Sequence, residues 1–160
     1  CGFGGGQDGF EKDDFGGGVI NAPTSSTTQN WNCQKALDYL KKNSRPFSVY
    51  QELPNSQKGK CATYVRKALE AAGFNMNGHP SEARLYGPFL KKLGFKEISP
   101  NGYVMQSGDI RVWQPYPGGR SEGHIHIFNG KNWVSDFVEP QLGGPNTGYR
   151  KHPNYKIYRK

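Results

Sequence analysis

Three residues able to carry out acyl transfer occur in settings that suit such chemistry. Cys61 is the third residue of the stretch GKCATYVRKALEAAGF, residues 59–74, and His124 and His126 lie in GHIHIF, residues 123–128. A cysteine attacks as its thiolate, which both a helix N-terminus and a neighbouring imidazolium stabilise. If the fold brings the thiol and an imidazole together, they can attack an amide carbonyl, and the amides at the helix start can stabilise the oxyanion.

A nucleophilic pair of this kind needs a third group that orients the imidazole ring. Our candidate is Asp136, on the strand that returns after the hairpin signal Asn-Gly at 129–130. A three-residue loop with a glycine bulge places Asp136 opposite His124, whereas a two-residue loop places Ser135 there. Ser135 and Asn132 are therefore the alternatives.

Each of these features also has a purely structural explanation. Cys61 lies on the apolar stripe of its helix, where a cysteine packs well as a small hydrophobic residue. The two histidines can occupy an exposed strand face or a core position with satisfied hydrogen bonds. Trp113 and Trp133, near the expected cleft, can stack on a sugar or peptide, or can simply pack within the sheet.

The elements that position these residues follow from the hydrophobic period. Apolar residues repeat at helical spacing in NCQKALDYLKKN, where Asn32 is the expected cap. They repeat again from Cys61 up to an expected stop at Gly73. A short helix is expected in SEARLYGPFLKKLG, capped by Ser81. The stretch RPFSVYQELPNSQ, with two prolines, is expected to be a loop.

The hydrophobic period changes to two in the second half of the chain. GDIRVWQP, GHIHIF and NWVSDF alternate like strands, and a last strand is expected over residues 155–158. Helices followed by antiparallel strands predict an α+β domain over residues 30–160. Residues 1–29 are rich in Gly, Ser and Thr and are expected to form a flexible leader.

Composition narrows the range of partners. The net charge of +8 over 160 residues favours an anionic partner, but the basic residues are scattered and no nucleic-acid motif accompanies them. No apolar run is long enough to span a membrane. Cysteine and histidine do not occur at zinc-site spacing, so no metal is expected. A Cys1–Cys33 disulfide would leave Cys61 free, although spacing does not establish that pair.

Taken together, GKCATYVRKALEAAGF, SGDIRVW and GHIHIFNGKNWVSDF resemble the NlpC-type and CHAP-type cell-wall cysteine peptidases and amidases. YGPFLKKLGF and HPNYKIYR are similar to antibacterial amidase effectors of type VI secretion and to phage lysins. By this resemblance Cys61 is the nucleophile, His124 the general base and Asp136 the third residue. His126 stands where the family usually has a small or apolar residue, and it would contact substrate or, with a shifted alignment, act as the base.

The resemblance also implies a fold, a substrate and a location. The fold would be a papain-like α+β core with N-terminal helices packed on a central antiparallel sheet. The substrate would be peptidoglycan, cleaved without metal or organic cofactor in the stem peptide or between muramic acid and L-alanine. The protein would be secreted and would act in the periplasm or at the cell wall of a target bacterium. An immunity protein would inhibit it. The alternatives are a cysteine protease or deamidase with a protein substrate, and a non-catalytic basic wall-binding module.

Overall fold

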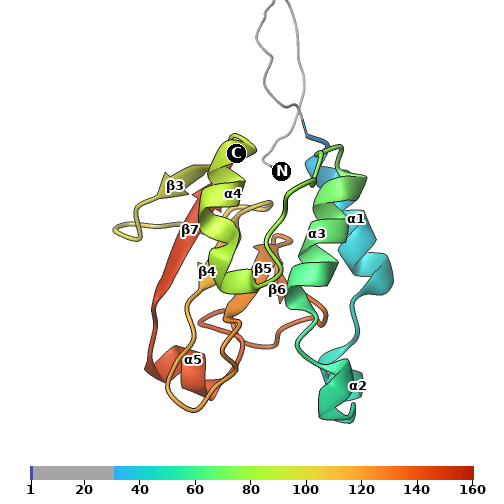
Figure 1. Cartoon of the computed structure of the whole chain (residues 1–160), viewed down its shortest axis with the longest axis vertical. Helices are drawn as coiled ribbons and strands as arrows, with labels where there is room; N and C mark the ends of the chain where they lie inside the picture. The colour runs from blue at the N-terminus through green and yellow to red at the C-terminus, as the bar shows by residue number, and fades with distance from the viewer. Residues whose placement is uncertain (2–30) are drawn as a thin grey trace, which may run out of the picture.

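A computed structural model of the chain describes Cys1 and residues 31–160 (Figure 1). Over these residues the fold is α+β, as the sequence predicts. The expected leader lies, apart from Cys1, outside the described residues. The helices are α1 (Cys33–Asn43), α2 (Phe47–Gln51), α3 (Cys61–Ala71), α4 (Tyr86–Lys92) and α5 (Thr147–Lys151), with short 3-10 turns η3 (Asn55–Gln57) and η4 (Ala83–Leu85).

The described strands form one antiparallel sheet in the order β3-β7-β4-β5-β6. In the central pair, Arg111 on β4 faces His126 on β5, and Trp113 faces His124. Since side chains alternate across a strand, these four residues share one face of the sheet. The strands are β3 (Lys96–Ile98), β4 (Ile110–Trp113), β5 (His124–Phe128), β6 (Trp133–Val134) and β7 (Tyr155–Arg159).

The apolar face of the sheet forms the hydrophobic core together with the helices. Ile110, Ile125 and Ile127 are completely buried, as are Val65 and Leu69 of α3. Helix α3 packs on β5, and α1 lies beside α3 on its far side (Figure 1). Each such side chain contributes about 1.5–3 kcal/mol to folding, so this packing holds α3 firmly against the sheet.

The second face of the sheet is buried as well, although it carries polar side chains. Arg111, His124 and His126 are all less than a tenth exposed. The segment of residues 135–151, with α5, covers this face, and the Tyr149 ring of α5 lies 5.5 Å from the Trp113 ring. The sequence therefore predicts the two-residue period of the strands correctly. However, both faces of the sheet are buried, and not only the apolar face.

Local signals in the sequence account for most helix ends. The Asn32 side chain accepts a hydrogen bond from the Lys35 amide at the start of α1, and Gly73, with φ of 105°, follows the end of α3, as predicted. The predicted Ser81 cap is wrong, because Glu82 precedes η4 and makes no side-chain cap bond. The stretch expected to be a loop forms α2 and η3 instead.

The Gly-Asp pair before β4 anchors the sheet. Asp109 is completely buried, and both its oxygens bind the Arg159 guanidinium of β7, at 2.8 and 2.9 Å. Its carboxylate also accepts from the Tyr103 hydroxyl at 2.6 Å and from the Gln106 amide at 2.9 Å. A buried carboxylate needs such partners, so Asp109 joins β4, β7 and the preceding loop.

The three cysteines, all of which the structure describes, divide into one disulfide and one free thiol. Cys1 is bonded to Cys33, and Cys61 is free and buried. The amino group of Cys1 donates to the Ser107 carbonyl. Among the described residues, no helix is long and apolar enough to cross a membrane.

Candidate active site

Helix α3 places Cys61 at its first residue, at the floor of a cleft of about 600 Å³. The preceding turn is fixed by Asp136, whose Oδ2 accepts a hydrogen bond of 3.1 Å from the Lys60 amide. The first amides of a helix have no partner within the helix and point toward its N-terminus. A carbonyl oxygen bound beside the Cys61 sulfur therefore meets N–H donors and the positive end of the helix dipole.

His124 is the first residue of β5 and lines the same cleft as Cys61. Burial opposes a charge on the ring, but the nearby Cys61 and Glu139 raise the pKa of His124, and the ring's Nε2 lies 2.7 Å from Oε2 of Glu139. Nδ1 is therefore the nitrogen left for Cys61. The preceding Gly123 has φ of 74°, and a Cβ there would lie 2.3 Å from the Trp113 carbonyl oxygen. Glycine at this position lets β5 start close to β4.

The loop between β5 and β6 decides which acidic residue reaches His124. The Asn129 side chain accepts from the amides of Lys131 and Asn132, at 2.9 and 2.7 Å, and this closes a four-residue loop. Strand β6 then ends after two residues. The chain bends, and the Glu139 amide donates to the Trp133 carbonyl at 2.9 Å. This reversal carries Glu139 under β5.

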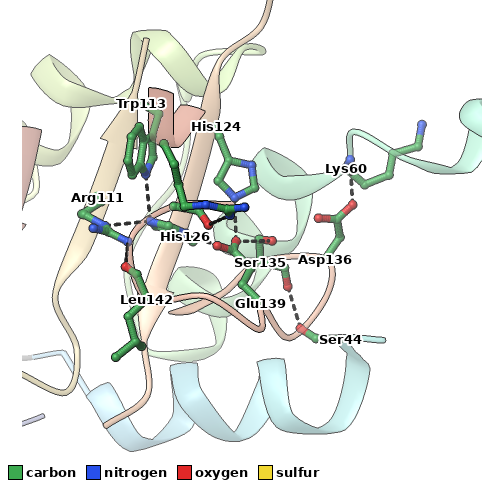
Figure 2. Close-up of polar contacts among 12 residues, drawn as sticks. Ser44, Lys60, Arg111, Trp113, His124, His126, Ser135, Asp136, Glu139 and Leu142 are labelled. Carbon is green, nitrogen blue, oxygen red and sulfur yellow. Dashed lines mark hydrogen bonds and ion pairs between the residues drawn. The ribbon is translucent and has the colours of Figure 1, made fainter. Parts of the chain in front are cut away.

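Asp136 does not contact His124, contrary to the sequence prediction (Figure 2). The prediction assumed that β6 stays paired with β5 beyond residue 134, whereas pairing stops there. Asp136 turns toward Lys60 instead. Its other oxygen, Oδ1, is buried and has no hydrogen-bond partner among the described residues. The alternative Ser135 is close to the site, where its hydroxyl donates to Glu139 Oε2 at 3.1 Å.

The electrostatics of the site favour an ionised carboxylate beside a charged imidazole. Burial opposes the charge on Glu139, but the two imidazoles next to it lower its pKa to about 2. Burial also opposes a charge on His124, but Glu139 and Cys61 raise the pKa of His124 well above its usual value. These charges therefore favour the imidazolium form of His124, which lies beside the Glu139 carboxylate.

His126, Trp113 and Trp133 are buried away from the cleft, so their predicted contact with substrate is wrong. All three are 0% exposed. The His126 ring stacks on Trp133 with centroids 4.5 Å apart, and the Trp113 indole donates to His126 Nε2 at 2.9 Å. These three residues pack beneath His124. The alternation of residues along the strands did not reveal this role, because it does not show that both faces of β5 are covered.

Other aromatic residues line the cleft, among them Tyr116, which the sequence suggests could stack on a sugar or peptide. Tyr50 stacks on Phe137 with ring centroids 4.0 Å apart, which builds one apolar wall. Tyr116 and Tyr149 meet edge to face at 4.8 Å on the opposite side. Tyr50 and Tyr149 lie in no motif, so no sequence signal marked them. Basic side chains also line the cleft, namely Lys58, Arg120 and Arg150.

His124, His126 and Glu139 could also be considered as metal ligands, because one atom of each lies within 4.8 Å of the others. Their hydrogen bonds argue otherwise. His126 Nε2 accepts N–H groups from both Arg111 and Trp113, at 3.0 and 2.9 Å. A cationic guanidinium at that point would repel a metal ion, so the cluster is better suited to binding protons.

A comparison with known protein families identifies the family of this chain. Residues 33–136, which include Cys61 and His124, match the family described as bacteriophage peptidoglycan hydrolase (Amidase_5). The chain belongs to this peptidoglycan hydrolase family. The matched segment ends before Glu139. No curated protein sequence matches this hydrolase.

Two solved structures resemble this peptidoglycan hydrolase over most of its length. One is the native type VI effector–immunity complex Tae3–Tai3 from Ralstonia pickettii, with 36% identity and a TM-score of 0.66 over 80% of this chain and 98% of the other. The second is the selenomethionine form of that complex, with 38% identity and a TM-score of 0.63 over 78% and 98%. The likeness therefore spans nearly the whole of the compared chain.

Proposed function

We propose that this peptidoglycan hydrolase is a cysteine amidase in which Cys61 is the nucleophile, His124 the general acid and base, and Glu139 the residue that orients His124. The observation that carries the proposal is that Cys61, at the start of α3, and His124 line one cleft, with the His124 ring 2.7 Å from the buried Glu139 carboxylate. Nucleophile, base and orienting group in this order define acyl transfer.

The reaction follows from the positions of these groups. The Cys61 thiolate attacks the amide carbonyl carbon, and the carbonyl oxygen becomes an oxyanion that the first amides of α3 stabilise. The His124 imidazolium gives its proton to the leaving nitrogen, and the C–N bond breaks. Water then attacks the thioester carbonyl while His124 takes its proton, the C–S bond breaks, and the product acid leaves with the Cys61 thiolate and the His124 imidazolium restored.

The cleft suits a peptide of the cell wall. Its volume, about 600 Å³, lies within the usual range for ligand sites. Lys58, Arg120 and Arg150 line it and would attract the carboxylates of a stem peptide. We propose cleavage of an amide in the stem peptide or between muramic acid and L-alanine.

The same arrangement supports a papain-like core of the NlpC or CHAP type. In that arrangement a helix that begins with the nucleophile packs on an antiparallel sheet that carries the histidine, as α3 and β5 do here. The third residue, Glu139, comes from the chain beyond β6 and not from the strand position that the resemblance implied for Asp136.

The structural relatives suggest where the protein acts. Both are complexes of a type VI effector with its immunity protein. We propose by extension that this hydrolase is an antibacterial effector that acts on the wall in the periplasm of a target cell, and that an immunity protein inhibits it by blocking the cleft over Cys61.

Purified peptidoglycan sacculi test the enzymatic proposal. The wild-type protein should release muropeptides whose masses identify the cleaved amide, and Cys61→Ala should lose more than about a thousandfold in rate. Sedimentation with sacculi is the matched control, since Cys61→Ala should still bind them. If Cys61→Ala releases muropeptides as fast as the wild type, the cysteine mechanism is wrong. If neither protein releases any, a wall-binding module remains.

A further inference from the structure

Behind the catalytic histidine lies a second buried imidazole that the reaction does not use. His126 is 0% exposed, and hydrogen bonds engage both its nitrogens. Nδ1 lies 2.7 Å from Oε1 of Glu139, while Nε2 accepts from Arg111 Nε at 3.0 Å and from Trp113 Nε1 at 2.9 Å. Figure 2 shows both imidazoles directed at the same carboxylate, with Arg111 and Trp113 directed at His126.

These contacts define where the protons of His126 lie. The indole and guanidinium groups are donors only, so the atom they both approach must present a lone pair. Nε2 is therefore unprotonated, and the ring proton is on Nδ1, from which it donates to Glu139. A second proton on Nε2 would meet two N–H groups directly, one of them cationic.

Arg111 is itself held in place, so it can impose this state. Its Nη2 donates to the Leu142 carbonyl at 2.8 Å. Its guanidinium carbon lies 4.0 Å from the centroid of the Trp133 ring, 5.0 Å from Trp113 and 5.2 Å from Tyr155. Cation–π contacts in a site closed to water stabilise a buried charge. The guanidinium is thus fixed at the far side of His126 from Glu139.

We propose that Arg111 and Trp113 are positioning residues that keep His126 as a neutral Nδ1–H donor, and so reserve the negative charge of Glu139 for the imidazolium of His124. The proposal rests on the proposed function for its effect on catalysis. It explains why a carboxylate that orients the catalytic histidine can have two imidazoles as neighbours without dividing its charge between them.

The surrounding charges agree with this assignment. Burial lowers the pKa of His126 to about 3, and Arg111 and His124 act in the same direction against the opposing effect of Glu139. His124 instead faces Cys61, which with Glu139 raises its pKa. The other ionisable groups around the two histidines come from every element packed against them. They are Arg111 of β4, Tyr155 of β7, Cys61 of α3, Tyr149 of α5 and Glu139 of the segment after β6.

Nitrogen NMR of the wild-type protein tests the proton assignment without any substrate. The chain has four histidines, so ring signals can be assigned with one variant each. Between pH 5 and 9 we expect His126 to show one unchanging pattern, with a protonated Nδ1 and an unprotonated Nε2. If His126 titrates in this range, or carries its proton on Nε2, the proposal is wrong. A failure of the protein to cleave peptidoglycan would leave this result unaffected.

Variants of Arg111 test the consequence for catalysis. In Arg111→Met, His126 should take up a second proton between pH 5 and 9. The acid limb of the pH profile of kcat/KM should then shift to higher pH, to the midpoint of the His126 titration. At pH 6 the rate should fall by about tenfold or more. Arg111→Lys keeps the positive charge and should leave the limb near its wild-type position.

The double variant separates charge control from a merely structural effect. Asparagine at position 126 can donate an N–H to Glu139 but cannot take a proton, so Arg111→Met with His126→Asn should restore the wild-type acid limb. A purely structural Arg111 would lower the rate without moving the limb, and that result would overturn the proposal. If Arg111→Met does not fold, Trp113→Phe removes one donor from Nε2 and should raise the His126 midpoint in the same direction.

Discussion

The Glu139 carboxylate lies 2.7 Å from the imidazole of His124, although the two residues are 15 positions apart and Glu139 is outside any strand. A short, fully buried contact between a carboxylate and an imidazole fixes the ring and stabilises its charged form. Cys61 lines the same cleft as that ring. This one contact therefore governs both the orientation and the charge of His124, the proposed catalytic base.

Replacing Glu139 with glutamine should remove the charge while keeping the shape. We expect kcat/KM to fall by about 10²- to 10⁴-fold, because the side chain no longer stabilises the imidazolium. Since the carboxylate raises the pKa of His124, the basic limb of the pH profile should also move to lower pH. Muropeptide release measured from pH 5 to 10 provides both values. A variant that keeps its rate within tenfold, with an unmoved basic limb, would exclude Glu139 from this role.

Replacing Asp136 with asparagine is the matched comparison. Asparagine keeps an oxygen that can accept the Lys60 amide, and its nitrogen takes the place of an oxygen without a partner among the described residues. We expect the rate to stay within about tenfold of the wild type, because no contact with His124 is lost. Asp136→Ala, which leaves the Lys60 amide without its acceptor, should lower the free energy of unfolding by about 1 kcal/mol. If Asp136→Asn is as inactive as Glu139→Gln, then Asp136 is the third catalytic residue.

Cys61 and His124, the proposed nucleophile and base, were easier to place from the sequence than the proposed third residue. Cys61 lies at the start of an eleven-residue helix with a clear apolar stripe, and His124 at the start of a strand in which apolar and polar residues alternate. Glu139 lies beyond the two-residue strand β6, after a bend held by bonds that no periodicity marks. The Asn129 side chain closes a four-residue loop there, which shifts the register from both loops that the Asn-Gly signal favours.

The polar face of the sheet was difficult to predict for a related reason. Arginine in an alternating strand usually points to solvent, yet Arg111 is only 3% exposed. Residues 135–151 cover that face, and the five-residue helix α5 within them is too short to show a helical period. Helix α2 was missed similarly, because it has five residues and buries none of them. Short elements are fixed by tertiary contacts, which the local sequence does not encode.

The glycine before His124 should be required by the close approach of β4 and β5. Gly123→Ala would place a Cβ 2.3 Å from the Trp113 carbonyl oxygen, at a backbone φ of 74°. We expect the free energy of unfolding to fall by well over about 1 kcal/mol and activity to fall with it, since β5 must move to accept the methyl group. Urea unfolding and muropeptide release measure the two effects.

Gly102 offers a matched control for this effect. Its φ is 67°, and a Cβ there would have nothing within 4 Å, so Gly102→Ala carries the backbone strain without the clash. Gly102→Ala should lose about 1 kcal/mol and keep its activity. Equal losses of stability in the two variants would show that the approach of the strands is not the cause.

The two imidazoles should give stability a maximum near about pH 6.5, the usual pKa of histidine. Burial lowers the pKa of His126 to about 3. Below pH 6.5 the unfolded chain therefore binds a proton at this residue that the folded protein does not bind, so the free energy of unfolding falls as the pH drops. The pKa of His124 is raised, so its contribution is complete below pH 6.5 and is lost as the pH rises through its folded value. Glu139, with its pKa lowered to about 2, adds to the loss only below about pH 4.5.

Between pH 4.5 and 6.5, the pH dependence of stability therefore reports on His126 alone among these three residues. Urea unfolding at half-unit steps should show the wild-type free energy rising with pH there, with a slope approaching one proton per molecule. His126→Asn should remove this slope, because asparagine does not titrate, and it should keep the decline above pH 6.5 that His124 causes. His79→Asn, at an exposed histidine, serves as the control and should keep both slopes. A wild-type protein whose stability is flat or falls from pH 4.5 to 6.5 would mean that His126 is protonated in the fold, and that Arg111 does not hold it neutral.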